Sequence, residues 1–175
     1  MDNYICIDGV KVLLNDSQIS ELRAIFEKRE AEKNSPFERQ YCSDKYYYIT
    51  STGEVGISFE ADCDCDLTHH NNANYCTDEE LLDQRALEEI LARRLWRYSM
   101  EHGGDKIDWS DGKSKYAIYY DTGISSFSIT SNVVCQITST AYFVDRETAL
   151  NAIREVVEPY MKEYPGFKSY RTHSA

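Results

Sequence analysis

The chain has no apolar run near the roughly 18 residues that a membrane-spanning helix needs, so we expect no transmembrane segment. Its three prolines and eight glycines exclude a collagen-like chain and a Pro/Gly-rich disordered chain. The start, Met1-Asp2-Asn3-Tyr4, has neither a basic residue nor an apolar stretch, which predicts no secretory signal. We therefore expect a cytoplasmic protein, in which the six cysteines are reduced thiols rather than disulfides.

Signatures of the common nucleophilic and nucleotide-binding enzymes are absent as well. The sequence contains no Gly-x-Ser-x-Gly, no Gly-x-x-x-x-Gly-Lys and no Gly-x-Gly-x-x-Gly. Glu88 and Glu89 are adjacent on a predicted helix and point apart, so they do not form a catalytic pair. His102 lies at the end of that helix, where a histidine typically interacts with the helix dipole. We expect a protein that is not an enzyme.

Positive charge is scarce, with 19 Lys and Arg against 30 Asp and Glu, for a net charge of −11. Nucleic-acid phosphates repel such a chain, so direct nucleic-acid binding is disfavoured. Segment 54–89 alone carries 11 acidic residues and one basic residue, Arg85. This segment predicts a surface that binds a basic protein partner, with a solvated, solubilising face as the alternative. The contact residues that we expect are Glu54, Glu60, Asp62, Asp64, Asp66, Asp78, Glu79, Glu80, Asp83 and, exposed on its strand, Tyr47.

One stretch, residues 62–76, is dense in side chains that can bind metals. Zinc takes four nitrogen or sulfur ligands, and the candidates are Cys63, Cys65, His69 and Cys76. The Cys-x-Cys spacing is tighter than that of zinc knuckles, and a second pair is absent. The alternating aspartates lack the glycine and the distal glutamate of a calcium loop. We expect an exposed acidic loop without a metal or other cofactor, and a metal-dependent enzyme using this loop is an alternative.

Hydrophobic periodicity and turn residues predict alternating strands and helices over most of the chain. Proline at 159 is expected to bend the last helix, and the tail from residue 168 is expected to fray. From the N-terminus, the predicted elements are a hairpin over 4–14 with an Asp8-Gly9 turn, a helix over 16–33, strands over 45–50 and 55–59, and an irregular stretch over 61–76. They continue with a helix over 78–101, strands over 115–121, 125–130 and 133–143, the last with a break near Thr138-Ser139, and a helix over 145–163.

Two parts of the chain match each other. Each has a strand that starts with Lys-Tyr, then a Thr-Gly turn, a second strand and a helix that starts with Tyr-x-x-Asp. The matched positions are Lys45 with Lys115, Gly53 with Gly123, Tyr75 with Tyr142, and Asp78 with Asp145. This repeat predicts two ββα units, at about 44–102 and 114–164. We predict an α+β fold with one antiparallel sheet, built from these two hairpins and the N-terminal hairpin, with three helices packed on it. The whole chain, 1–175, is expected to be a single domain, with a subregion over 1–40.

The same patterns resemble a known group of proteins. They are Asn34-Ser35-Pro36-Phe37-Glu38-Arg39, Lys45-Tyr46-Tyr47-Tyr48-Ile49, Gly53-Glu54-Val55, Asn74-Tyr75-Cys76-Thr77, Ile107-Asp108-Trp109, Lys115-Tyr116-Ala117-Ile118-Tyr119-Tyr120 and Thr140-Ala141-Tyr142-Phe143. Over about residues 4–167 the chain is similar to small uncharacterised proteins of phages and prophages of Gram-positive, mainly clostridial, bacteria. The resemblance implies a phage accessory protein in the bacterial cytoplasm, and it assigns no functional residue.

Together these expectations favour an anti-CRISPR-like inhibitor. Its acidic segment would occupy the basic nucleic-acid channel of a host defence nuclease, because carboxylates and phosphates accept from the same Lys and Arg donors. The main alternative is a protein that sequesters a nucleotide signal. Such a protein needs a cationic pocket, for which Arg93, Arg94 and Arg97 are the candidates.

Overall fold

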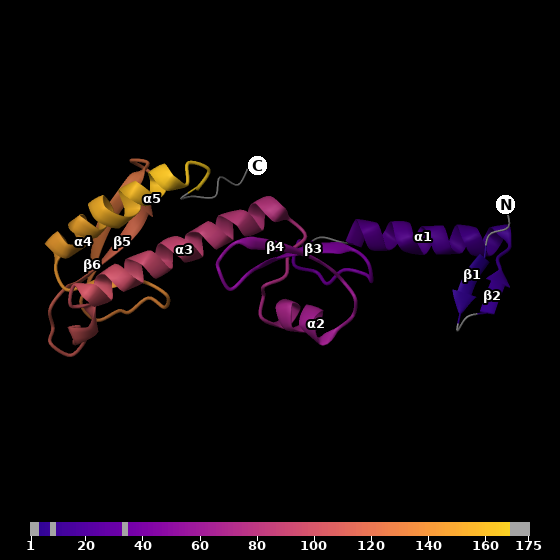
Figure 1. The fold of residues 1–175 in the computed structure, drawn as a ribbon, viewed down its shortest axis with the longest axis horizontal. Helices are drawn as coiled ribbons and strands as arrows, with labels where there is room; N and C mark the ends of the chain where they lie inside the picture. The colour runs from indigo at the N-terminus through magenta and orange to yellow at the C-terminus, as the bar shows by residue number, and fades with distance from the viewer. Residues whose placement is uncertain (1–3, 8–9, 33–34, 169–175) are drawn as a thin grey trace. The chain divides into compact units, whose positions relative to one another are not determined.

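The computed structural model describes residues 4–7, 10–32 and 35–168, with backbone only at 4–7, 10 and 26–32 (Figure 1). Helices and antiparallel strands both occur, which confirms the α+β class. The chain divides into two compact units, residues 1–46 with 58–77 and residues 47–57 with 78–175. The single domain expected for 1–175 stays a prediction, and each unit is described by itself. None of the described helices is long and apolar enough to cross a membrane.

The N-terminal elements follow the sequence prediction. Strands β1 (Tyr4–Ile7) and β2 (Val10–Leu13) pair antiparallel, and the predicted Asp8-Gly9 turn lies outside the described residues. Helix α1 (Asp16–Glu32) begins after Asn15, whose Oδ1 accepts from the Gln18 amide at 2.9 Å. The Gln18 Oε1 accepts in return from the Asn15 amide at 3.0 Å. These reciprocal bonds satisfy two amides that the helix itself leaves unpaired.

Strands β3 (Lys45–Ile49) and β4 (Val55–Phe59) form a hairpin, as predicted, and the boundary between the two units runs through it. The irregular stretch predicted after it is wrong, because helix α2 (Asp64–Asn71) forms there. Asp66 stabilises the start of α2 by accepting from the Cys63 amide at 3.2 Å. Helical periodicity could not reveal α2, since Leu67 is its one aliphatic residue and is itself exposed.

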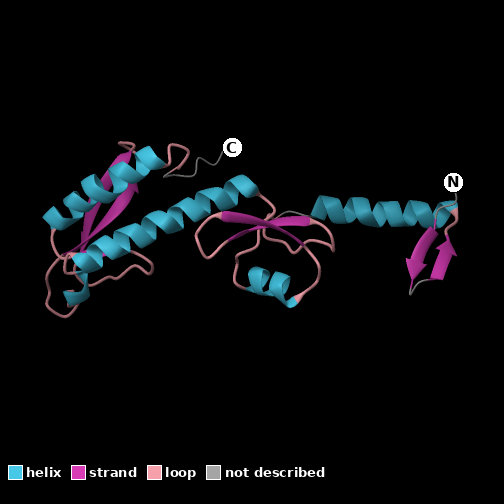
Figure 2. Ribbon diagram, viewed as in Figure 1, coloured by secondary structure: helices cyan, strands magenta, loops and turns pink. Residues whose placement is uncertain are grey.

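The second unit contains the long helix α3 (Glu79–Glu101), a short 3₁₀ turn η1 (Gly104–Lys106) and a three-stranded antiparallel sheet. Strands β6 (Ser126–Asn132), β5 (Lys115–Asp121) and β7 (Tyr142–Phe143) lie in that order in the sheet. Figure 2 distinguishes the helices of the chain from its strands by colour. The predicted strand over 133–143 is thus wrong except at its end, and a turn lies at residues 138–139, where its break is predicted. The Tyr142 hydroxyl accepts from the Ile137 amide at 2.8 Å, which holds the preceding segment as a loop.

The last predicted helix is present but interrupted. Helix α4 (Arg146–Ala152) passes through a π-helical turn, η2 (Ile153–Val157), into helix α5 (Glu158–Glu163). Pro159 has no amide hydrogen to donate to the carbonyl of Glu155, so the regular α-helical ladder cannot continue there. The sequence predicts a bend at Pro159, and the structure has instead a π-helical turn immediately before it.

The predicted single sheet is wrong, because the described strands form three separate sheets. The hairpin β5–β6 gains its third strand from β7 rather than from β3 or β4. Helices α3 and α4 pack on this three-stranded sheet around a core of Tyr98, Phe143, Ala149 and Ala152. A second cluster joins Leu91 of α3 to Val157, Tyr160 and Phe167. These clusters fix the positions of α3, η2 and α5, which carry the cleft described below.

Candidate functional site

Three of the ten residues expected to contact a partner are buried, which contradicts their predicted place on a binding surface. Tyr47, Glu60 and Asp66 are exposed by only 5%, 3% and 2%. Tyr46 of the same strand is also buried, so alternation along β3 leaves neither tyrosine on a free face. The other seven residues are exposed: Glu54, Asp62, Asp64, Asp78, Glu79, Glu80 and Asp83.

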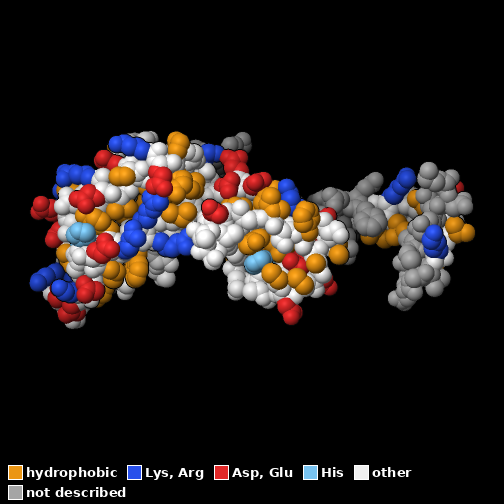
Figure 3. Space-filling view, in the orientation of Figure 1, with side chains coloured by type: hydrophobic (Ala, Val, Ile, Leu, Met, Phe, Trp, Pro, Cys, Tyr) orange, Lys and Arg blue, Asp and Glu red, His pale blue; other side chains and the backbone are white. Residues whose placement is uncertain are grey.

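Four of these exposed acids lie together at the start of α3. Asp78 is the N-cap, and its Oδ1 accepts from the Leu81 amide at 3.0 Å. Glu80 forms an ion pair with Lys168. Neither Glu79 nor Asp83 has an ion-pair partner among the described residues, and burial, with a smaller effect of the Glu79 charge, raises the pKa of Asp83. Acidic side chains gather over the start of α3 in the space-filling view, and basic ones over its middle (Figure 3).

The candidate zinc ligands do not converge. Cys63 and Cys65 are exposed whereas Cys76 is buried, and the Cys63 Sγ donates to Asp66 at 3.2 Å. His69 lies instead with its Nδ1 2.9 Å from the Tyr46 hydroxyl. Within the described part of the chain, no three His, Cys, Asp or Glu side chains are placed to hold a metal ion.

The buried acids of the first unit belong to a hydrogen-bonded network. Glu60 accepts from Arg39 Nη2 at 2.8 Å and from the Tyr75 hydroxyl at 3.1 Å, and the Arg39 bond in particular lowers the pKa of Glu60. Arg39 Nη2 also donates to Asp62 at 2.8 Å, so that exposed acid is already paired. The network ties the loop before β3 to the end of β4.

Tyr46 and Tyr75 form the aromatic centre of the same unit. Their rings stack with centroids 4.1 Å apart, and the Tyr46 hydroxyl donates to Asp66 at 2.7 Å. Burial raises the pKa of Tyr75 to about 12 and moves the pKa of Tyr46 in the same direction. Both hydroxyls therefore stay protonated at neutral pH and donate to buried carboxylates, Tyr46 to Asp66 and Tyr75 to Glu60.

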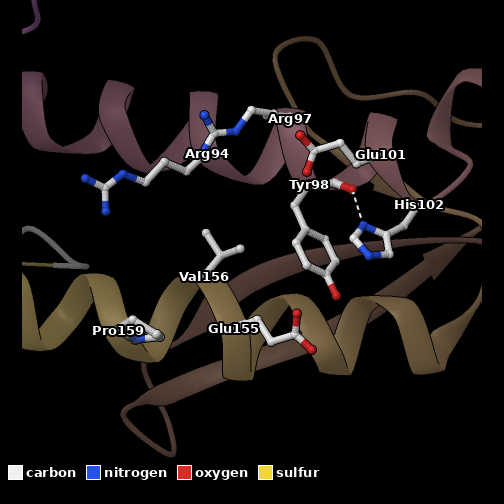
Figure 4. A pocket seen from close by; sticks show the side chains of 8 residues that line it. All are labelled: Arg94, Arg97, Tyr98, Glu101, His102, Glu155, Val156 and Pro159. Carbon is white, nitrogen blue, oxygen red and sulfur yellow. Dashed lines mark hydrogen bonds between the residues drawn. The ribbon is translucent and has the colours of Figure 1, made fainter.

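A cleft of about 630 Å³ lies in the second unit, between the C-terminal half of α3 and the segment η2–α5 (Figure 4). The side chains that line it are Arg94, Arg97, Tyr98, Glu101, His102, Glu155, Val156 and Pro159. Its volume falls within the range of about 300–1,000 Å³ that is typical of small-ligand sites. The cleft brings together two of the three predicted arginines, Arg94 and Arg97. All three arginines line a neighbouring, smaller hollow of the same unit, together with Thr52, Ile90 and Trp96.

The basic residues of the cleft are unequally engaged. Arg94 donates to both carboxylate oxygens of Glu163, at 2.6 and 3.0 Å, and its guanidinium lies over the Tyr160 ring. Arg97 has no ion pair among the described residues and is exposed. His102 is the C-cap of α3, as its position in the sequence predicted, with Nδ1 2.8 Å from the Tyr98 carbonyl oxygen.

The acidic residues of the cleft were missed by the sequence analysis. Glu101 and Glu155 are separated by 54 residues along the chain, and only the packing of α3 against η2 brings both into one cleft. The spacing of Arg97 and Glu101, four apart on a helix, is the one signal that could have indicated half of this arrangement.

Comparisons of the chain with protein-family models, curated proteins and solved structures find no match. The resemblance to phage and prophage proteins therefore stays an expectation.

Proposed function

We propose that this chain is a non-enzymatic phage accessory protein that acts in the bacterial cytoplasm. In this proposal it inhibits a nucleic-acid-targeting defence complex of the host by occupying a basic nucleic-acid channel, as anti-CRISPR proteins do. The supporting observation is the group of exposed acids at the start of α3, which we call the acidic turn: Asp78, Glu79, Glu80 and Asp83.

The acidic turn has a physical reason to bind cations. Glu79 and Asp83 are four residues apart on α3, and like charges at that spacing destabilise a helix by about 0.2–0.5 kcal/mol. No described cation offsets them, so a Lys or Arg side chain from a partner would relieve this repulsion. Carboxylates accept from the same donors as nucleic-acid phosphates. The buried Glu60, Asp66 and Tyr47 no longer belong to the proposed contact set.

The test is inhibition of a reconstituted CRISPR effector nuclease by the purified protein. The double variant Glu79→Lys/Asp83→Lys should lose inhibition, because it turns the two unpaired acids into cations. The control Glu147→Lys/Glu158→Lys makes the same charge change at two other exposed helical positions of the second unit. The control should inhibit like the unmodified protein. If the acidic-turn variant inhibits equally well, this contact surface is wrong.

A second candidate function is sequestration of a small molecule. The cleft beside Arg97 favours it, since its volume suits a small ligand. The chemistry of the cleft, however, differs from that of the cationic nucleotide pocket that the arginines alone predicted.

A further inference from the structure

The cleft between α3 and η2–α5 carries balanced rather than uniform charge. Two arginines and two glutamates line it, together with His102 and the apolar surfaces of Tyr98, Val156 and Pro159. Figure 4 shows the charges separated along the cleft: Arg94 points toward the end near Pro159, and Glu101, His102 and Glu155 lie toward the other, with Arg97 between. A ligand that fills this cleft therefore meets positive charge at one part and negative charge at another.

We propose that the cleft binds a small zwitterion of the size of a tripeptide, with its carboxylate at Arg97 and its ammonium group at Glu101 and Glu155. This proposal does not depend on the acidic turn. The positive position is defined by Arg97, since both terminal nitrogens of Arg94 already donate to the Glu163 carboxylate. A guanidinium without an ion pair is a ready donor for a carboxylate.

The negative position is defined by two carboxylates from different elements. Glu101 is in the last turn of α3, and Glu155 is in the π-helical turn, where it faces the hydroxyl of Tyr98 (Figure 4). Neither carboxylate forms an ion pair with a described cation, although Glu101 is only four residues from Arg97. An ammonium group placed between these carboxylates would gain a charge-assisted hydrogen bond to each.

The shape of the cleft depends on the π-helical turn, which supplies both Glu155 and Val156 to its wall. Such turns insert an extra residue into a helix at a cost in regularity, and they occur frequently at functional sites. Here the turn precedes Pro159, which also lines the cleft. Val156, which neighbours Glu155, gives the uncharged part of a peptide an apolar surface (Figure 4).

A polyphosphate nucleotide fits these charges less well. Its phosphates could pair with Arg97, but they would also face Glu101 and Glu155, and like charges in close contact oppose binding. A neutral apolar ligand would leave the same charges without partners when it displaced water from them. The pattern therefore selects a ligand that carries both charges.

The test uses isothermal titration calorimetry with the full chain and the tripeptide Ala-Leu-Ala as probe. Two analogues each lose one charge, N-acetyl-Ala-Leu-Ala and Ala-Leu-Ala amide, and ATP represents the polyphosphates. The free tripeptide should bind about tenfold more tightly than either analogue, which corresponds to about 1.4 kcal/mol for each lost charge. If the acetylated peptide binds as well as the free one, the cleft recognises a carboxylate alone and the zwitterion proposal is overturned. Tighter binding of ATP, or no binding of the tripeptide, would overturn it too.

Variants locate the binding to the cleft. Arg97→Gln should reduce the affinity for the free tripeptide to that for the amide, because both then lack the carboxylate contact. Glu155→Gln should reduce the affinity for the free tripeptide toward the affinity for the acetylated peptide. Arg93→Gln is the matched control, since Arg93 is an exposed arginine of the same helix that does not line this cleft. Equal loss in the control would place the ligand elsewhere and contradict the proposal, and circular dichroism of each variant verifies that it is folded.

Discussion

At the scale of single residues, the carboxylate of Asp66 holds together the small core of the first unit. It accepts from the Tyr46 hydroxyl at 2.7 Å, the Ala61 amide at 2.8 Å and the Cys63 amide at 3.2 Å. These bonds connect β3, the end of β4 and the start of α2 through one buried side chain. The sequence analysis assigned Asp66 to a binding surface because neighbouring aspartates suggested an exposed loop. A buried acceptor with several donors has a structural role instead.

Asp66→Asn should therefore destabilise the first unit. The amide nitrogen that replaces one carboxylate oxygen cannot accept a hydrogen bond, so at least one buried donor is left without a partner. Such a loss typically costs about 1–3 kcal/mol. Urea denaturation followed by circular dichroism measures the free energy of unfolding. The control Asp64→Asn changes an exposed acid of the same helix and should remain within about 0.5 kcal/mol of the unmodified protein.

Asp66 also predicts how stability depends on pH. Its hydrogen bonds, first of all that from Tyr46, hold the pKa of Asp66 well below its usual range. A carboxyl whose pKa is lowered by folding stabilises the fold above its unfolded pKa of about 3.9, and this contribution is lost as the pH falls below that value. Denaturation at a series of acidic pH values should thus show a decline in stability that is smaller in Asp66→Asn. An equal decline in both proteins would contradict the prediction.

At the scale of elements, the two Thr-Gly turns of the repeat differ in conformation although their sequences match. Gly53 has φ of +93°, and a Cβ added to it would lie 2.9 Å from Arg93 Nη2 and 3.2 Å from Ile90 Cγ1. In the β5–β6 turn the positive φ belongs to Ser125, and Gly123 does not require it. The equivalence of the two glycines in the sequence therefore does not extend to their backbones.

Gly53→Ala should destabilise the protein by about 1–2 kcal/mol, because left-handed backbone conformation is unfavourable for a residue with a Cβ. Gly123→Ala is the matched control and should change stability by less than about 0.5 kcal/mol. Chemical denaturation of both variants gives the comparison. Equal effects would mean that the two turns have the same conformation in solution.

Helix starts are the feature of the repeat that sequence and structure share most closely. Asp78 and Asp145 are both N-caps, and the Asp145 Oδ1 accepts from the Thr148 amide at 2.7 Å. Asp145→Ala should lower the free energy of unfolding by about 1 kcal/mol, whereas Asp145→Asn should retain most of it, since asparagine is an equally good cap. If Asn is as harmful as Ala, the charge rather than the cap bond stabilises α4.

Elements were predictable where local chemistry determines them. The hairpins and the helix starts depend on turn residues and caps that lie within a few positions of each other. The loop after β6 was predicted as a strand from its β-branched residues, yet Val134 is 84% exposed there. A hydrogen bond to the hydroxyl of Tyr142, which the local pattern cannot reveal, holds that loop in place. Helix α2 was missed because the apolar pattern of the sequence does not reveal it. Its start depends on the side chain of Asp66 rather than on an apolar stripe.

At the scale of the whole molecule, the acidic segment 54–89 is not one structural feature. Glu54 and residues from Asp78 onward belong to the second unit, whereas Glu60 to Asp66 belong to the first. Charge counted along the sequence identified the acidic turn correctly as exposed, but it included Glu60 and Asp66 in error. The acids of the cleft, Glu101 and Glu155, lie outside this segment. A count of charge along the sequence misses them, because tertiary packing rather than sequence proximity brings them together.

The last prediction concerns the salt dependence of partner binding. If the acidic turn steers the protein to a basic channel, association with the inhibited nuclease should slow as salt is added, because the screening length falls from about 30 Å at 0.01 M to about 3 Å at 1 M. Surface plasmon resonance separates the association rate from the dissociation rate. Glu79→Gln/Asp83→Asn should associate more slowly at low salt and depend less on salt than the unmodified protein.

This neutral variant leaves the cap residue Asp78 unchanged, so α3 should keep its start, which circular dichroism verifies. Its dissociation rate should change less than its association rate, since long-range attraction acts mainly before contact. An association rate that is insensitive to both salt and these substitutions would exclude the acidic turn as the steering surface. Exposed tyrosines of the second unit's sheet, such as Tyr119 at 43% exposure, would then become the leading candidates for the interface, because aromatic anchors bind through packing rather than through net charge.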